Sequence, residues 1–151
     1  MPDGTHKAEA RLSLNSRLAE LTLVCPWVDR LAAVHGIPEE KVFAINLCLE
    51  EALSNVIRHG YKGAPDQSLT VDFSVNAGGE LVFTIEDHAP VFNACAYQES
   101  PAPASLDEIK PGGQGIRLMR RFANSLAWEP LPHGNRLTLG FRYGAPGGEP
   151  R

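Results

Sequence analysis

The sequence has few cysteines, no long apolar run and no surplus of positive charge, and each shortage excludes a class of protein. Its three cysteines, Cys25, Cys48 and Cys95, lie more than twenty residues apart. An odd and widely spaced set fits neither a disulfide framework nor a zinc site, so we expect reduced, structural cysteines. No apolar segment approaches the ~18 residues of a membrane span, and the polar first ten residues lack an apolar signal segment. We therefore expect no membrane association and a cytoplasmic location.

The charge balance argues against one kind of nucleic-acid binding. Lys and Arg number 14 and Asp and Glu number 18, which gives a net charge of −4 and an isoelectric point near 5.7. Binding by phosphate neutralisation requires an excess of cationic side chains to release counterions. A protein partner or a small ligand is the better expectation, with no direct contact to nucleic acid. The length of 151 residues and the 43% hydrophobic content suffice for one domain with its own core.

Apolar residues in the first half recur at helical spacing. From Leu18 to His35 they recur every three or four residues, and we expect the regular helix to begin with Pro26 in its first turn. A second helix is predicted from about Pro38 to about Arg58, because a proline followed by two glutamates suits a helix N-terminus. The core stripe of this second helix is predicted to be Ile45, Leu49, Ala52, Leu53 and Val56.

Elsewhere the apolar period is two, which predicts strands. An antiparallel hairpin is expected over residues 69–75 and 81–85, and two further strands over 125–129 and 135–143. A short strand is also expected over 11–14. Because apolar and polar residues alternate along these strands, we expect one face of the sheet to be covered and the other to be exposed.

One long segment between the strands has little periodicity. Residues 93–114 are rich in proline and glycine, which is typical of a functional or a disordered loop. We expect such a loop to be mobile in the free domain and to order as a lid over a bound ligand. A short helix should follow from Gly115, with Ile116, Met119 and Phe122 turned inward.

The predicted element order is β-α-α-β-β-α-β-β, which groups the helices on one side of a sheet. The fold class is therefore α+β, a two-layer α/β sandwich with helices on one face of a mixed, mostly antiparallel sheet. The domain is expected to span residues 11–143, between a disordered leader over 1–10 and a disordered tail over 144–151.

Three segments carry residues suited to nucleotide chemistry. In the first, Glu51-Ala-Leu-Ser-Asn55, a carboxylate and a carboxamide lie one helical turn apart, away from the apolar stripe. Mg²⁺ prefers oxygen ligands and often binds through one protein oxygen and substrate phosphates, so Asn55 could hold the metal and Glu51 could act as a base. Taken alone, the pair is more typical of a solvated helix face.

The other two segments are also ambiguous when each is taken alone. Asp87 ends an apolar strand, where a carboxylate can accept a hydrogen bond from a ligand amine or can simply form a turn. The glycines of Pro111-Gly-Gly-Gln-Gly115-Ile116 precede a helix, where backbone N–H groups can approach a phosphate. A plain glycine turn is the alternative for this segment.

In this order the segments resemble the GHKL (Bergerat-type) ATPase superfamily, and most closely the stand-alone anti-sigma-factor serine-protein kinases, over residues 11–143. The segment from Glu51 to Tyr61 resembles the N-box, Asp87-His-Ala-Pro-Val-Phe92 the G1 box, and Gly113-Gln-Gly115 the G2 box. The resemblance implies the histidine-kinase-like ATPase fold.

The same resemblance implies roles for individual residues. Asn55 would hold Mg²⁺, and Glu51 would be the catalytic general base. The remaining cofactor-binding residues would be Asp87 at the adenine amino group, Phe92 beside the base, and Ala89, Gly112, Gly113, Gly115 and Ile116. ATP and Mg²⁺ are the implied cofactors.

The implied activity is phosphorylation of a serine or threonine on a small anti-sigma-factor antagonist, together with sequestration of a sigma factor. Sigma factor and antagonist are thus the implied partners. Whether the chain forms a homodimer is left open by the resemblance. The alternative is a regulatory module that uses nucleotide to choose a protein partner without transferring phosphate.

Two departures from the family pattern bear on adenine affinity. Ala89 stands where the G1 box usually has a glycine, and a Cβ at a position of positive φ would lower affinity. The last strand lacks the usual Gly-Thr pair, because Thr138 lies four residues beyond Gly134. Among the other polar and aromatic residues, His59 is expected to cap its helix, Trp27 and Trp128 to pack, and the arginines Arg117, Arg120 and Arg121 to form a solvated face.

Overall fold

The computed structural model describes residues 8–93 and 115–142. The expected lid from residue 94 onward, Cys95, the glycines at 112 and 113, most of the leader and the C-terminal tail lie outside the described residues. No helix within the described ranges is long and apolar enough to cross a membrane.

The described elements follow the predicted order. They are β1 (Ala10–Asn15), the 3₁₀ helix η1 (Leu18–Leu23), α1 (Val24–His35), α2 (Glu39–Asn55), the π-helix η2 (Val56–Gly60), β2 (Ser68–Val75), β3 (Leu81–Asp87), α3 (Gly115–Phe122), β4 (Ser125–Leu131) and β5 (Gly134–Phe141).

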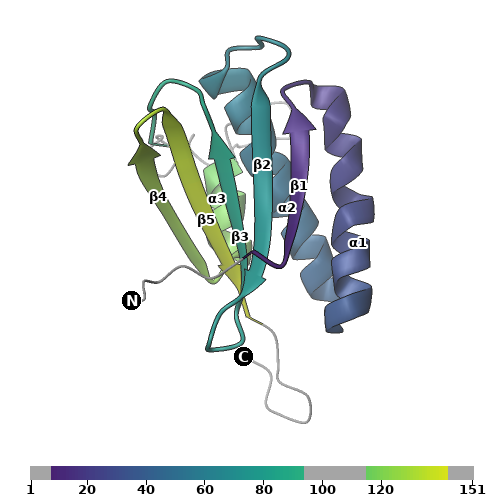
Figure 1. The fold of residues 1–151 in the computed structure, drawn as a ribbon. Coiled ribbons are helices and arrows are strands. Elements are labelled where there is room, and N and C mark those ends of the chain that lie inside the picture. The colour runs from purple at the N-terminus through teal and green to yellow at the C-terminus, as the bar shows by residue number, and fades with distance from the viewer. Residues whose placement is uncertain (1–7, 94–114, 143–151) are drawn as a thin grey trace, which may run out of the picture.

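The strands form one sheet in the order β1-β2-β3-β5-β4, with the three α-helices packed on one face (Figure 1). All four pairings of neighbouring strands are antiparallel. The expected mixed, mostly antiparallel sheet is thus fully antiparallel in its described strands. The register places Asp87, at the end of β3, opposite Asn135 near the start of β5.

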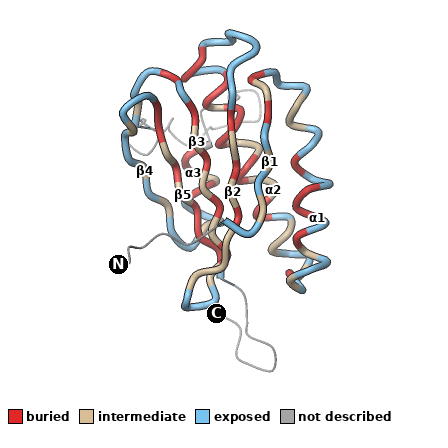
Figure 2. The backbone as a smooth tube through the Cα atoms, viewed as in Figure 1, coloured by how far each residue is buried: buried red, intermediate tan, exposed pale blue. Residues whose placement is uncertain are grey.

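Buried residues alternate with less buried ones along β2 and β3, which shows that one face of the sheet is covered. Leu69, Val71 and Phe73 of β2 are buried, as are Leu81, Phe83 and Ile85 of β3, while the residues between them are mostly half-buried (Figure 2). This confirms the predicted hairpin with one covered face.

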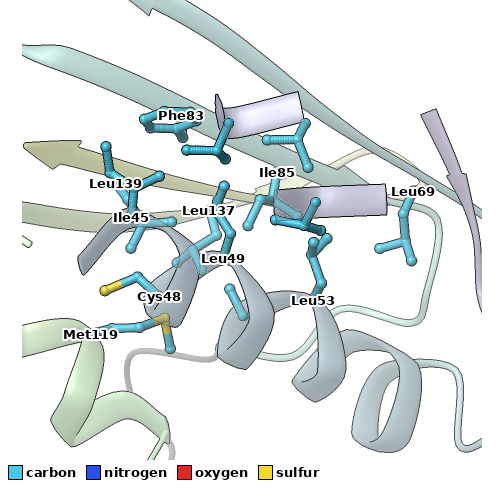
Figure 3. Packing of buried hydrophobic residues seen from close by; sticks show 14 of the residues in the cluster. Ile45, Cys48, Leu49, Leu53, Leu69, Phe83, Ile85, Met119, Leu137 and Leu139 are labelled. Carbon is cyan, nitrogen blue, oxygen red and sulfur yellow. The ribbon is translucent and has the colours of Figure 1, made fainter. Parts of the chain in front are cut away.

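The core forms where the stripe of α2 meets this covered face. All five predicted stripe residues are buried, at 7% exposure or less. In Figure 3, Ile45, Cys48, Leu49 and Leu53 of α2 lie between the sheet, represented by Phe83, Ile85, Leu137 and Leu139, and Met119 of α3. The polar residues of α2 are thereby fixed relative to the end of β3.

The first helix differs in part from its predicted stripe. The α-helix begins at Val24, so Pro26 lies in its first turn as predicted, but the residues before it form the 3₁₀ helix η1. A 3₁₀ helix has a tighter period, so the apolar spacing from Leu18 does not continue in phase, and Leu18 and Cys25 are exposed. The buried face consists of Val24, Trp27, Val28 and Leu31.

Two of the three cysteines fall within the described residues, and they differ. Cys48 is fully buried in the core, as expected of a structural cysteine, and burial raises the pKa of its thiol to about 12. Cys25 is exposed, so the expectation of a structural role was wrong for it.

The second helix loses its α-helical geometry just after the polar pair that it carries. It ends at Asn55, and a π-helical turn from Val56 to Gly60 takes the place of the predicted continuation to Arg58. Turns of this kind widen the helix locally and occur often at functional sites. The wide turn closes with the N–H of Tyr61 donating to the carbonyl of Val56 at 2.7 Å.

Candidate functional site

A small cavity of about 20 Å³ brings three predicted site residues together. Asn55 from α2, Asp87 from the end of β3 and Phe92 from the following loop all line it. The rest of the lining is Ala52, Val56, Ile85, Met119, Trp128, Asn135 and Leu137. An apolar cavity with a few convergent polar groups is typical of a ligand site, although this volume holds little more than a water molecule. A purine ring would therefore enter only with movement of the lining side chains.

Asp87 is buried and has two hydrogen bonds to the same oxygen. Only 3% of the residue is exposed, and its Oδ1 accepts from the backbone N–H of Ala89 at 2.8 Å and from Nδ2 of Asn135 at 3.0 Å. Burial raises the pKa of the Asp87 carboxyl above its ordinary value, while the hydrogen bonds act in the opposite direction. Asp87 thus both forms the turn and lines the cavity, so the two interpretations of this residue are compatible.

Asn135 is a site residue that sequence reasoning missed. The residue is 4% exposed, and its Oδ1 accepts from the backbone N–H of Phe92 at 3.0 Å and from Nε1 of Trp128 at 3.1 Å. The one signal in the sequence is its position directly after Gly134 at the start of the last strand. Trp128, expected only to pack, also acts as a hydrogen-bond donor at the cavity.

The structure places Thr138 away from this site. Together with Thr84, Glu86 and Arg136, it lines a groove on the face of the sheet opposite the helices. Two residues on a strand that differ by an odd number point to opposite faces, so Asn135 and Thr138 cannot serve the same cavity.

Gly134 is required by a close backbone approach. Its φ is +151°, and a Cβ at this position would overlap the backbone carbonyl of Asp87. We expect Gly134→Ala to lower the free energy of unfolding by about 3 kcal/mol, because the neighbouring backbone must shift. Thermal or denaturant unfolding measures this effect.

A second glycine provides the control for this substitution. Gly79 also has a positive φ, +83°, but no atom lies within 4 Å of the place that its Cβ would occupy. Gly79→Ala therefore measures the cost of the conformation alone, about 1 kcal/mol. Equal losses of stability in the two variants would show that the approach to Asp87 carries no cost.

Ala89 does not have the strained conformation expected from its replacement of a glycine. In the described ranges the only residues other than glycine with positive φ are Lys62 and Asp66. Ala89 is buried, and a Cβ placed on Gly60 would lie 3.2 Å from that of Ala89 and 2.9 Å from Cε1 of Phe92. Gly60 is therefore the position that has no room for a side chain. The conformational strain that we expected for the backbone of Ala89 is absent.

Tyr61 connects the turn after β3 to the segment that follows α2. Its hydroxyl donates to the carbonyl of Ser68 at 2.7 Å and accepts from the backbone N–H of His88 at 2.7 Å. The side chain is buried, and burial raises the pKa of its phenol. The hydroxyl therefore stays neutral and helps to fix the position of Asp87.

Glu51 and Asn55 each present a buried oxygen without a partner. Oε2 of Glu51 and Oδ1 of Asn55 are shielded from solvent, and within residues 8–93 and 115–142 neither has a hydrogen-bond partner. Unsatisfied buried acceptors are rare and suggest an ion, a water or a ligand donor at the site. Oxygen donors are also the ligands that Mg²⁺ prefers, so the residues present fit this metal.

Helix α3 forms the wall of the site next to α2. Gly115 is its first residue, Ile116 and Met119 are buried, and Phe122 is partly buried, which confirms the predicted inward face. Ile116 packs in the core without lining the small cavity. Of the three arginines, Arg120 and Arg121 are exposed as predicted, whereas Arg117 is half-buried with its Nε shielded from solvent.

Known proteins resemble the chain in sequence. It is 28% identical over 114 residues to the serine/threonine-protein kinase BtrW of Bordetella bronchiseptica, covering 75% of this chain and 79% of that protein. It is 23% identical over 117 residues to an anti-sigma F factor of Halalkalibacterium halodurans, covering 78% and 70% respectively. The chain is thus related, at low identity, to an anti-sigma factor and to a serine/threonine kinase.

Solved structures share the fold. The RsbU and RsbW domains of a Mycobacterium tuberculosis protein match with a TM-score of 0.62 at 15% identity, over 88% of this chain. This chain spans only 32% of that longer one. The histidine kinase domain of a blue-light-activated kinase from Erythrobacter litoralis matches with a TM-score of 0.52 at 18% identity, over 91% of this chain and 65% of that one.

The model of one protein family covers most of the chain. The family is described as the histidine kinase-like ATPase domain, and its model matches residues 14–141, which include every described residue of the site. The fold agrees with this match. The chain belongs to the histidine kinase-like ATPase domain family.

Proposed function

We propose that the protein is an ATP-dependent serine/threonine kinase of the anti-sigma type. It phosphorylates a small antagonist protein and sequesters a sigma factor when that antagonist is absent. The observation that carries the proposal is a pair of buried oxygens on Glu51 and Asn55, one helical turn apart, that have no hydrogen-bond partner among the described residues and lie next to the cavity that contains Asp87. Membership in the ATPase family and kinship to a kinase and an anti-sigma factor support it.

The nucleotide base is assigned to the cavity. Asp87 accepts a hydrogen bond from the adenine amino group, because its carboxylate is held by two donors at Oδ1 and has a second oxygen to offer. Ala89 contributes through the N–H that fixes this carboxylate, and Phe92 lies beside the base.

The phosphate end is assigned to α2 and to the start of α3. Asn55 would hold Mg²⁺ through Oδ1, and the bound ion would neutralise charge that develops on the phosphates. The backbone at Gly112, Gly113, Gly115 and Ile116 would bind phosphate oxygens at the helix N-terminus, of which residues 115 and 116 are described.

Glu51 is assigned the role of general base. Its Oε2 is buried and without a hydrogen-bond partner in the part of the chain that the structure describes, so it is available to accept the proton of the attacking hydroxyl. Phosphoryl transfer depends chiefly on positioning and electrostatics, which α2 supplies by holding Glu51 and Asn55 on one helix that is packed against the core.

The names of the relatives support the proposed partners. One relative is an anti-sigma F factor, and one structural match contains an RsbW domain. We infer a sigma factor and an antagonist protein as partners.

Incubation with labelled ATP, Mg²⁺ and candidate antagonist proteins tests the proposal. The expected result is label on a serine or threonine of one antagonist, dependent on Mg²⁺. Binding of ATP without transfer to any antagonist, together with nucleotide-dependent binding of a partner, would instead identify a nucleotide-gated module.

A further inference from the structure

A chain of two hydrogen bonds, one buried and one partly buried, crosses three neighbouring strands at the cavity. Trp128 of β4 donates through Nε1 to Oδ1 of Asn135 on β5, and Nδ2 of Asn135 donates to Oδ1 of Asp87 at the end of β3. The three strands lie side by side in the sheet (Figure 1). All three side chains line the cavity, so an indole at the sheet edge is linked to the carboxylate assigned to the nucleotide base.

The partners of Asn135 permit only one orientation of its amide. Oδ1 accepts from the indole of Trp128 and from the backbone N–H of Phe92, and both of these groups can only donate. Nδ2 faces three oxygens that can only accept when Asp87 is ionised: Oδ1 of Asp87 at 3.0 Å, and the carbonyls of Pro90 at 3.2 Å and Ala89 at 3.4 Å. If the amide were rotated by 180°, its NH₂ group would face two donors and its oxygen would face three acceptors.

The fixed amide determines which atom of Asp87 is offered to a ligand. Among the described residues, the side-chain hydrogen bonds of Asp87 to the N–H of Ala89 and to Nδ2 of Asn135 both use Oδ1, so Oδ2 is the oxygen that faces the ligand in this proposal. A purine with an amino group at position 6 presents a donor to this oxygen. A purine with a 6-oxo group presents an acceptor, and two facing acceptors in a buried site repel each other.

We propose that Asn135, oriented by Trp128, is a positioning residue that sets the preference of this site for 6-amino over 6-oxo purine nucleotides. The proposal rests on the proposed nucleotide site at Asp87, and it adds two residues that neither touch the phosphates nor take part in transfer. Trp128 acts indirectly. Its indole N–H fixes the side-chain amide of Asn135, and this amide in turn fixes the carboxylate of Asp87.

The test compares binding of ATP with binding of inosine triphosphate, whose base has a 6-oxo group and an N1–H where adenine has a 6-amino group and an unprotonated N1. Dissociation constants are measured by calorimetry with Mg²⁺ for the wild type, Trp128→Phe and Asn135→Leu. The wild type should prefer ATP. Loss of the single indole donor in Trp128→Phe should reduce the preference by roughly 3- to 10-fold, and Asn135→Leu by roughly 10- to 100-fold.

Trp128→Phe is the deciding variant, because it keeps an aromatic ring at the cavity. Asn135→Leu removes five hydrogen bonds and so tests folding as well as binding. Trp27→Phe is the matched control: Trp27 is buried on α1, where its ring packs edge-on against Phe83 at 6.1 Å. This control should keep the wild-type preference.

The ratio of the two affinities separates positioning from a purely structural role. If Trp128 and Asn135 only hold the fold together, both nucleotides bind more weakly by the same factor and the ratio is unchanged, which would overturn the inference. The measurement does not depend on phosphoryl transfer. A wild type that prefers ATP but labels no antagonist would overturn the kinase proposal alone, whereas a wild type that binds neither nucleotide would overturn both.

Discussion

Glu51→Gln is expected to slow phosphoryl transfer by roughly 10²–10⁴ while ATP and the sigma-type partner bind nearly as before. Glutamine keeps the size and polarity of the side chain on α2 but cannot accept a proton. The lower end of the range is expected, because the transition state of phosphoryl transfer is loose and needs little help from a base. Single-turnover transfer of label to the antagonist gives the rate, and calorimetry gives the affinity for ATP.

Asn55→Ala should behave differently, although the residue lies only one turn further along α2. Asn55 lines the cavity and its Oδ1 is a buried acceptor without a partner in the described residues, so its loss should abolish Mg²⁺-dependent nucleotide binding and every activity that requires it. Asn46→Ala is the matched control. Asn46 also lies on α2, and its shielded Oδ1 has no partner in residues 8–93 and 115–142, but it does not line the cavity.

The two variants together distinguish an enzyme from a binding module. If the protein is a kinase, the wild type transfers phosphate, Glu51→Gln binds ATP but loses transfer, and Asn55→Ala loses both ATP binding and transfer. A wild type without transfer to any antagonist, combined with unaltered partner binding in Glu51→Gln, would favour the nucleotide-gated module. Equal effects of Asn55→Ala and Asn46→Ala would remove the metal assignment.

The parts of the fold that sequence predicts well are those governed by one strong period. Leu69, Val71 and Phe73 alternate because one face of β2 meets the helices, and this alternation is visible in the order of the amino acids. The same holds for Ile45 and Leu49 on α2, whose spacing matches a single buried stripe. Polar residues on another face of α2 therefore stand out as candidates from their spacing alone.

Sequence reasoning failed where a local change of geometry shifted the phase of a helix. The apolar residues from Leu18 onward have the spacing of an extended α1, but the 3₁₀ turn before Val24 rotates them relative to the helix, and Leu18 is 46% exposed. The π-helical turn after Asn55 gave no sign in the apolar spacing either.

Asn135 was missed for a different physical reason. Its role depends on partners at Asp87, Phe92 and Trp128, which are 48, 43 and 7 residues away along the chain. Only the pairing of β5 between β3 and β4 brings these groups together. A buried polar residue defined by long-range pairing has no local period, so its type alone suggests a turn or a surface position.

Because of this network, replacing one carboxylate oxygen of Asp87 by an NH₂ group should change which nucleotide the site prefers. In Asp87→Asn, the side-chain oxygen can still accept from Ala89 and Asn135, which places the new NH₂ group where the free carboxylate oxygen was. This donor would face the amino group of adenine, so ATP binding should weaken by roughly 10- to 100-fold, or about 1–3 kcal/mol. GTP binding should change little or improve, because its 6-oxo group accepts from the new donor.

Asp72→Asn provides the same chemical change outside the site. Asp72 lies in the groove on the opposite face of the sheet, where it pairs with Arg11 at 2.6 Å. An exposed ion pair contributes little, so this variant should keep the wild-type affinities for both nucleotides. Calorimetric titration with each nucleotide decides the comparison, and an unchanged affinity for ATP in Asp87→Asn would make Asp87 a turn residue only.

Asp87→Asn should also stabilise the free protein at neutral pH, which separates a binding defect from unfolding. Burial raises the pKa of Asp87 in the folded state above its unfolded value. The contribution of such a group to stability is fully present below the unfolded pKa and is lost as the pH rises through the folded pKa. Asparagine has no charge to bury, so the variant should melt above the wild type at neutral pH, with the gap closing as the pH falls toward the unfolded pKa. A lower melting temperature at neutral pH would mean that the ionised carboxylate stabilises the turn more than its burial costs.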